Sequence, residues 1–140
     1  MLAKSLRRAR ALSFIAFAAF AVTSTAASFA SDSWPEFRGP SAQGRSDATG
    51  LPQRWSETEN VRWKVAIHDR GWSTPVVLGN QVWLTTAHPD GKEMFAICVD
   101  RETGRIVHDL KLFDIESPSP LGNDLNCYAS PSPVIEPGRV

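Results

Sequence analysis

The chain has 140 residues but only two cysteines, and it lacks the side-chain spacings that identify common catalytic or metal sites. Its histidines, His68, His88 and His108, are scattered, and with the cysteines they form no metal-ligand spacing. No Ser/His/Asp spacing, Gly-rich phosphate loop or zinc pattern is present. The cysteines themselves leave two interpretations open. An exported protein could join Cys98 to Cys127 in a disulfide, or the apolar run around Cys98 could bury a free thiol.

Long apolar runs are also scarce. The clearest one, Ala11–Val22, has about a dozen residues and is too short to span a bilayer. A basic start precedes it, formed by Lys4, Arg7, Arg8 and Arg10, and small residues follow it. This arrangement predicts a helical secretory signal peptide over residues 1–30, cleaved between Ala30 and Ser31, with Ala27 as a second choice. The alternative is an uncleaved anchor.

Neither sign of charge dominates the whole chain, which carries 15 basic and 15 acidic residues. Four of the basic residues and none of the acidic ones lie in residues 1–30. Residues 31–140 therefore keep 11 basic and 15 acidic residues, a net charge of −4. This balance argues against nucleic acid as a partner, because nucleic acid requires a basic face. It fits a periplasmic or secreted protein that meets the membrane only through its export signal.

The pattern after the signal segment is that of β-structure. Residues 31–59 are rich in Pro, Gly and Ser, and we expect an irregular N-terminal segment there. From Asn60 the period is two, because Val61, Trp63, Val65 and Ile67 would share one face. The alternation predicts a half-buried strand.

Four further apolar runs follow, separated by tight turns. Gly79-Asn80 separates "TPVVL" from a return strand at Val82–Ala87, and Asp90-Gly91 leads into "EMFAICV". The stretch "DRETG" joins this run to "RIVHDLKLF". Asp100 can fix that turn by accepting a backbone N–H, and Gly104 supplies a positive φ. No helical period is present after residue 30, so the sequence predicts an all-β antiparallel meander of four-stranded units.

One stretch of the chain recurs. "TPVVLGNQV" at Thr74–Val82 reappears as "SPVIEPGRV" at Ser132–Val140, at an offset of 58 residues without a gap. Self-similarity on this scale marks stacked supersecondary units, and four strands in about 40–50 residues is the size of a propeller blade.

These motifs resemble a known family. The pattern S-x-P-V-V-x-x-x-x-V at Ser73–Val82, followed by A-x-C-V-D-x-x-T-G-R at Ala96–Arg105, resembles the blade repeat of the pyrroloquinoline-quinone (PQQ)-like β-propellers. Together with "WPEFRGP" and "LPQRWSETENVRWK", it looks like the start of exported PQQ-repeat proteins of environmental bacteria, planctomycetes among them. The resemblance covers Trp34–Val140. It implies that residues 60–140 form one blade and parts of its neighbours, in an N-terminal piece of a longer protein or a truncated gene model.

The repeat departs from the family at one place. The family's blades usually end T-G-[KR]-x-x-Trp, but here Thr103-Gly104-Arg105 is followed by His108. Simple alternation would put Ile106, His108, Leu110 and Leu112 on one face. We therefore expect a packed and hydrogen-bonded histidine in the position of an indole, with a ligand or acid–base role as the alternative.

Candidate binding residues are few. Arg70 and Trp72 could contact a ligand or cofactor if "DRGW" lies at the mouth of a propeller channel. Asp90 and Glu93 could coordinate calcium, but two carboxylates in a hairpin are more typical of a solvated turn, and Glu57 and Glu59 share no partner that would suit proton transfer. The tryptophans, Trp34, Trp55, Trp63, Trp72 and Trp83, could form a carbohydrate or quinone platform, although packing between blades is the interpretation we favour.

Two main functions follow from the resemblance. The first is a non-catalytic exported scaffold or binding protein, whose partner is a protein, a small molecule or a carbohydrate. The second is a PQQ-dependent alcohol or sugar oxidoreductase with PQQ and calcium as cofactors, whose catalytic residues lie outside this chain. The chain has no adjacent cysteine pair of the kind that often covers PQQ in such enzymes.

Overall fold

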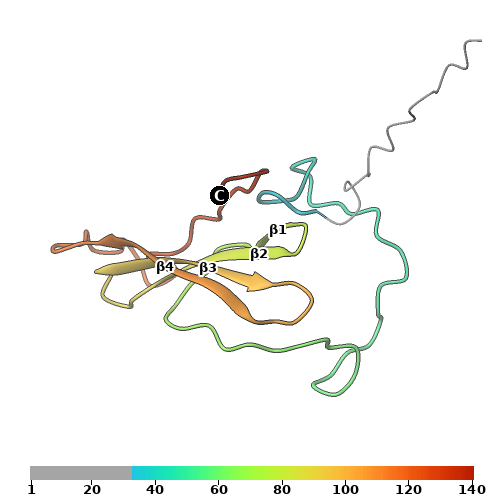
Figure 1. The fold of residues 1–140 in the computed structure, drawn as a ribbon. Coiled ribbons are helices and arrows are strands. Elements are labelled where there is room, and N and C mark those ends of the chain that lie inside the picture. The colour runs from blue at the N-terminus through green and yellow to red at the C-terminus, as the bar shows by residue number, and fades with distance from the viewer. Residues whose placement is uncertain (1–32) are drawn as a thin grey trace, which may run out of the picture.

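The computed structural model describes residues 33–140, which build a four-stranded antiparallel sheet (Figure 1). Its strands are β1 (Val76–Leu78), β2 (Gln81–Ala87), β3 (Glu93–Asp100) and β4 (Ile106–Asp114). They lie in chain order, and each pairs with the next. The predicted all-β meander is thus confirmed, and residues 33–140 contain no helix, so none that could cross a membrane. The predicted signal peptide and its cleavage site at Ala30 and Ser31 lie outside the described residues.

The first hairpin forms where the sequence places it. Leu78 pairs with Gln81 across the two-residue turn, and Gly79 adopts a φ of +57° that a side chain would disfavour. Asn80 keeps a negative φ, so only one position of this turn requires glycine. Trp34 exchanges two backbone hydrogen bonds of 2.8 Å with Val77, which closes the outer edge of β1.

The chain also follows β2 before β1 begins. Arg70 exchanges backbone hydrogen bonds of 3.2 and 2.9 Å with Ala87 at the far end of β2. Gly71 lies so close to β2 that a Cβ there would be 2.2 Å from the carbonyl oxygen of Thr85. The Ser73 hydroxyl accepts the Thr85 N–H at 2.9 Å and lies 3.3 Å from its carbonyl oxygen. A side chain therefore replaces the backbone ladder where residues 71–75 lie opposite only the three residues Leu84–Thr86.

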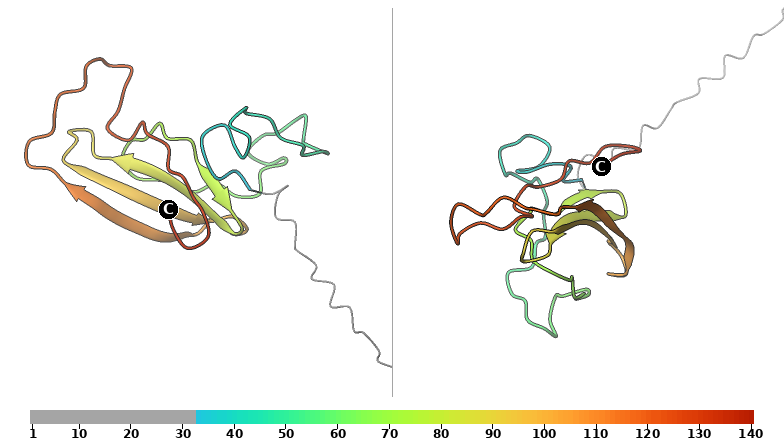
Figure 2. Two further views of the ribbon diagram at one scale, coloured as in Figure 1. Left: turned by 90° about the horizontal axis from the view of Figure 1, so that it is seen from above. Right: turned by 90° about the vertical axis from the view of Figure 1, so that its left-hand side faces the viewer.

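Two extended segments cover the two faces of the sheet (Figure 2). On one face the late part of the chain packs, and Ile135 joins a buried cluster of Val76, Trp83, Ala96 and Cys98. On the other face lie Ile97 and Val99, which are 0% and 2% exposed. Burial of one such side chain contributes about 1.5–3 kcal/mol, so these faces hold the sheet together.

Residues 61–68, which cover the second face, are not the strand that the sequence predicts. The alternation is present, because Trp63, Val65 and Ile67 are half-buried while their neighbours are exposed. Yet no backbone hydrogen bond joins residues 61–68 to the sheet. The period of two is right for these three side chains, but Val61, which we expected on the same face, is 45% exposed. The segment lies over a face of the sheet instead of pairing with an edge strand.

The prediction that Ile106, His108, Leu110 and Leu112 share one face of β4 is also wrong. His108 pairs with Cys98 and Leu110 with Ala96, so both point to the face of the Ile135 cluster. Ile106 pairs with Val99 and points to the opposite face, because Val107 is an extra residue in a bulge. A second bulge at Leu112 shifts the register again, so simple alternation fails twice along this strand.

Candidate functional site

The segment His68–Trp72 brings together the two ligand contacts that the sequence suggested. The guanidinium of Arg70 lies 4.9 Å from the centre of the Trp72 ring, a cation–π contact. Both side chains are exposed. The backbone N–H of Trp72 donates to the carbonyl oxygen of Ala129 at 3.1 Å. The close approach of Gly71 to β2 fixes this arrangement.

Beside this pair lies a histidine–carboxylate cluster that sequence reasoning missed. His68 Nδ1 is 2.7 Å from the carboxylate of Asp69, and Nε2 is 3.1 Å from both oxygens of Asp109 on β4. The imidazole ring is perpendicular to the Phe95 ring, with the ring centroids 4.7 Å apart. Hydrogen bonding to Asp109, and then to Asp69, raises the pKa of His68, while burial opposes the shift.

The cluster limits its own chemistry. Because each ring nitrogen faces a carboxylate, the imidazole fits as a protonated double donor. In that state neither nitrogen is free to ligate a metal or to accept a proton. The cluster therefore acts as a connection between Asp69, in the covering segment, and Asp109 on β4. No sequence signal marks this contact, because His68 and Asp109 are 41 residues apart.

The calcium candidates are occupied by other partners. Asp90 lies 2.7 Å from His88 Nδ1 and accepts the N–H of Lys92, and these contacts lower the pKa of Asp90, the backbone contact most. The same pair raises the pKa of His88. Glu93 is 3.0 Å from the ammonium group of Lys111. Within residues 33–140, no three His, Cys, Asp or Glu side chains are grouped to hold a metal ion. Of the other acidic pair, Glu57 binds Lys64 at 2.8 Å.

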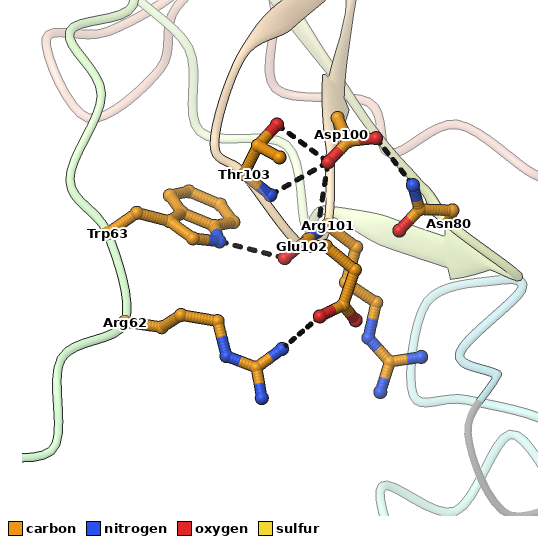
Figure 3. A network of polar contacts seen from close by, with 7 residues as sticks. All are labelled: Arg62, Trp63, Asn80, Asp100, Arg101, Glu102 and Thr103. Atoms are coloured by element: carbon orange, nitrogen blue, oxygen red, sulfur yellow. Dashed lines mark hydrogen bonds and ion pairs between the residues drawn. The ribbon is translucent and has the colours of Figure 1, made fainter.

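The turn after β3 is held by a polar network (Figure 3). Asp100 accepts the N–H groups of Glu102 and Thr103, and the hydroxyl of Thr103, at 2.7–3.1 Å. These donors, with the Thr103 hydroxyl first, lower the pKa of Asp100. Asn80 on the neighbouring turn also donates to its carboxylate. The prediction that Asp100 fixes this turn is confirmed.

An indole from the covering segment packs on this turn. Trp63 Nε1–H donates to the carbonyl oxygen of Arg101 at 2.8 Å, and Arg62 binds Glu102 at 2.7 Å (Figure 3). Gly104, with φ of +72°, lies under the ring, and a Cβ there would be 2.7 Å from it. The bare glycine is therefore needed twice, for its φ and for the space that Trp63 fills.

His108 is packed but has no hydrogen bond among the described residues. Its ring stacks on Trp83 with centroids 5.7 Å apart and planes at 14°. Trp83 on β2 and His108 on β4 both pair with Cys98 on β3, so the two rings meet over Cys98. The side chain is exposed on its other side. The packing part of the expectation holds, and the hydrogen-bonding part does not.

The two cysteines are free and buried, so the structure contains no disulfide between them. Cys98 belongs to the cluster under Ile135, and Cys127 belongs to a separate cluster with Ala87. Burial raises the pKa of the Cys98 thiol. Of the two interpretations that the sequence left open, the structure has the buried thiol, and it has it at both positions.

The tryptophan side chains lie in different surroundings. Trp83 is 6% exposed in the sheet, whereas Trp55 and Trp72 are 71% and 45% exposed. Among residues 33–140, no two tryptophan rings make a stacked or edge contact.

A hollow of about 610 Å³ lies under the loop after β4, and it is lined by Tyr128, prolines, serines and apolar side chains without a charged group.

Comparison with known proteins adds no relative. No protein family matches the chain, and neither a curated protein nor a solved structure is significantly similar to it.

Proposed function

We propose that the chain is part of an exported PQQ-repeat-like β-propeller that serves as a non-catalytic scaffold or binding protein. The observation that carries this proposal is the docking of Trp63 on the turn Asp100–Gly104. Residues 61–68 lie face to face with the sheet and share no ladder with it. This is how a strand of one blade would meet the next blade.

The spacing of residues supports the same interpretation. Trp63 precedes His108 by 45 residues, within the size of a propeller blade, which is about 40–50 residues. Residues 61–68 would then correspond to β4 of a neighbouring blade, with Trp63 in the place of His108. In that neighbour the indole required by the family's repeat is present.

The repeated stretch has repeated geometry. Leu78 pairs with Gln81 across Gly79-Asn80, and Glu136 pairs with Arg139 across Pro137-Gly138, at the same offset of 58 residues. The second hairpin would begin the following blade. Its Ile135 already packs on the first sheet, as neighbouring blades do.

The scaffold role rests on how the polar groups are used. The carboxylates and imidazoles of the candidate site bind one another and the backbone, and in doing so they join segments of the chain. Export rests on the sequence of residues 1–30 alone, and so periplasmic or secreted localisation is part of the proposal. Arg70 and Trp72 remain the contacts that we would assign to a ligand.

Tandem copies of the repeat test the propeller. The unit of residues 74–131 would be inserted in one, two or more extra copies, each joined in phase to Ser132. Because stacked units bury one another's exposed faces, the midpoint of urea unfolding should rise with copy number. Copies that leave the midpoint unchanged, or that unfold independently, would refute stacking.

A second experiment separates scaffold from enzyme. The full product of the gene would be mixed with PQQ and calcium, and reduction of an artificial dye by alcohols or aldoses would be followed. We expect neither dye reduction nor bound quinone absorbance, and either signal would favour the oxidoreductase. Tryptophan fluorescence with a panel of polysaccharides tests a carbohydrate ligand, which would change the emission of the exposed Trp55 or Trp72.

A further inference from the structure

Residues 61–68 are held on the sheet by side chains at two ends. At one end the Trp63 indole binds the Asp100–Gly104 turn, and this contact contains no group that titrates near neutral pH. At the other end His68 reaches Asp109 on β4. Between the ends, Ile67 is only half-buried. No backbone hydrogen bond fixes these residues to the sheet, and the next one along the chain joins Arg70 to Ala87. Between Trp63 and Arg70, the polar side-chain contact with the sheet is that of His68.

The geometry of His68 suits only its protonated form. Two carboxylates, of Asp69 at 2.7 Å and Asp109 at 3.1 Å, face opposite nitrogens of one ring. A neutral imidazole has one N–H, so one carboxylate would then face a lone pair and be repelled. Asp69 adopts a left-handed φ of +59°, a conformation that aspartate tolerates better than most residues.

No other cation replaces His68 in this cluster. On its own segment the other charged groups are Arg62 and Lys64, which bind Glu102 and Glu57, and Arg70 follows them. Those of β4 and of the neighbouring turn and start of β3 are Lys111, Asp114, His88, Asp90, Lys92 and Glu93. Lys111 is bound to Glu93 and Asp114 at 3.0 Å, and the Arg70 guanidinium lies over Trp72. His88 is bound to Asp90, although the charge of Asp69 also acts on it. Within residues 33–140, Asp69 and Asp109 each form an ion pair with His68 alone.

We propose that His68, Asp69 and Asp109 form a pH-sensitive clasp that holds the second half of this segment, residues 65–68, against β4 when the imidazole is protonated and releases it when the imidazole is neutral. The clasp concerns the segment on which the proposed function rests, and it would regulate that contact between neighbouring blades. Its chemistry needs only the contacts of this chain, so it can hold or fail independently of the propeller.

The direction of the pH dependence follows from linkage. The pKa of His68 is raised above its ordinary value of 6.5. The contribution of the clasp is therefore fully present below that ordinary value and is lost as the pH rises through the raised pKa. Because His68 and Asp109 are 37% and 44% exposed, salt should weaken the clasp.

Nuclear magnetic resonance of the whole 140-residue chain tests the clasp. Three signals would be followed from acid to alkaline pH: the His68 ring, its cross-peaks with Phe95, and the exposure of the Ile67 methyl groups to a soluble paramagnetic agent. We expect the cross-peaks to disappear and Ile67 to become exposed with the same midpoint as His68. Contacts that persist unchanged through that titration would overturn the proposal.

Variants separate the clasp from general effects of charge. Asp109→Asn should lower the pKa of His68 and make the contact less dependent on pH, because an amide can donate to a neutral nitrogen. His68→Gln should remove the pH dependence of Ile67. The matched control is Asp90→Asn, which removes the partner of His88 and should leave the Ile67 midpoint unchanged. A midpoint that follows His88 instead would refute the assignment to His68. If a variant fails to fold, the titration of the native chain still decides.

Discussion

Replacement of Gly104 by alanine tests the contact that carries the proposed function. The new Cβ would lie 2.7–2.9 Å from three atoms of the Trp63 ring, so the indole must move away from the turn. The alanine must also adopt the φ of +72° that Gly104 has, which a side chain disfavours, or the backbone of the turn must change. Two separate penalties are therefore expected from one methyl group.

The magnitude can be divided between these penalties. A left-handed conformation with a Cβ costs about 1–2 kcal/mol. Displacement of Trp63 loses its hydrogen bond to Arg101, worth about 1 kcal/mol, and part of the burial of its ring. The losses at Trp63 together form its coupling with position 104, and contacting residues typically show a coupling of about 0.5–3 kcal/mol. With the backbone penalty added, we expect Gly104→Ala to lower the free energy of unfolding by about 1.5–5 kcal/mol.

Gly79→Ala is the matched control. Gly79 also has a positive φ, of +57°, but a Cβ there would point into open space with no group within 4 Å, so only the backbone penalty applies. Urea unfolding of both variants, alone and with Trp63→Ala, completes a double-mutant cycle. In the Trp63→Ala background, the two glycine substitutions should have similar effects. If Gly104→Ala is no worse than Gly79→Ala when Trp63 is present, the indole does not dock as described.

Three other predictions concern the connection to β2 and the thiols. Gly71→Ala should destabilise the chain by at least about 2 kcal/mol in urea unfolding, because backbone must move from the Thr85 carbonyl and backbone hydrogen bonds are lost; a neutral effect would contradict the close approach. Ser73→Ala should cost about 1–3 kcal/mol by leaving the Thr85 N–H without its partner, whereas an unchanged unfolding midpoint would mean that water replaces the hydroxyl. Cys98 and Cys127 should react with a thiol reagent only after unfolding, and an intact mass lower by two hydrogen atoms would instead indicate a disulfide.

Local pattern was sufficient for the four strands and their turns. Apolar alternation, Gly79 and the Asp100–Gly104 turn act over a few residues, and a hairpin register follows from its turn. The pairing of Arg70 with Trp72 was also accessible, since they are two residues apart on one extended segment. These features depend only on residues a few positions apart, so the sequence was enough to predict them.

The candidate site was less accessible because its partners come from distant segments. A period of two shows that Trp63, Val65 and Ile67 bury one face, but it does not say whether their backbone pairs with an edge or crosses a face. His68 meets Asp109 only because residues 61–68 lie over the face of the sheet that carries Asp109.

The sequence by itself determined the meander, because strand alternation and turn glycines are properties of short stretches of chain. Only the tertiary structure decided which side chains meet. The bulge at Val107 separates Ile106 from His108, and the two thiols enter different clusters. The physical reason is that a bulge, a buried cluster or a charge pair forms when the interaction between two distant segments lowers the free energy of the fold. That interaction energy cannot be read from the local sequence of either segment.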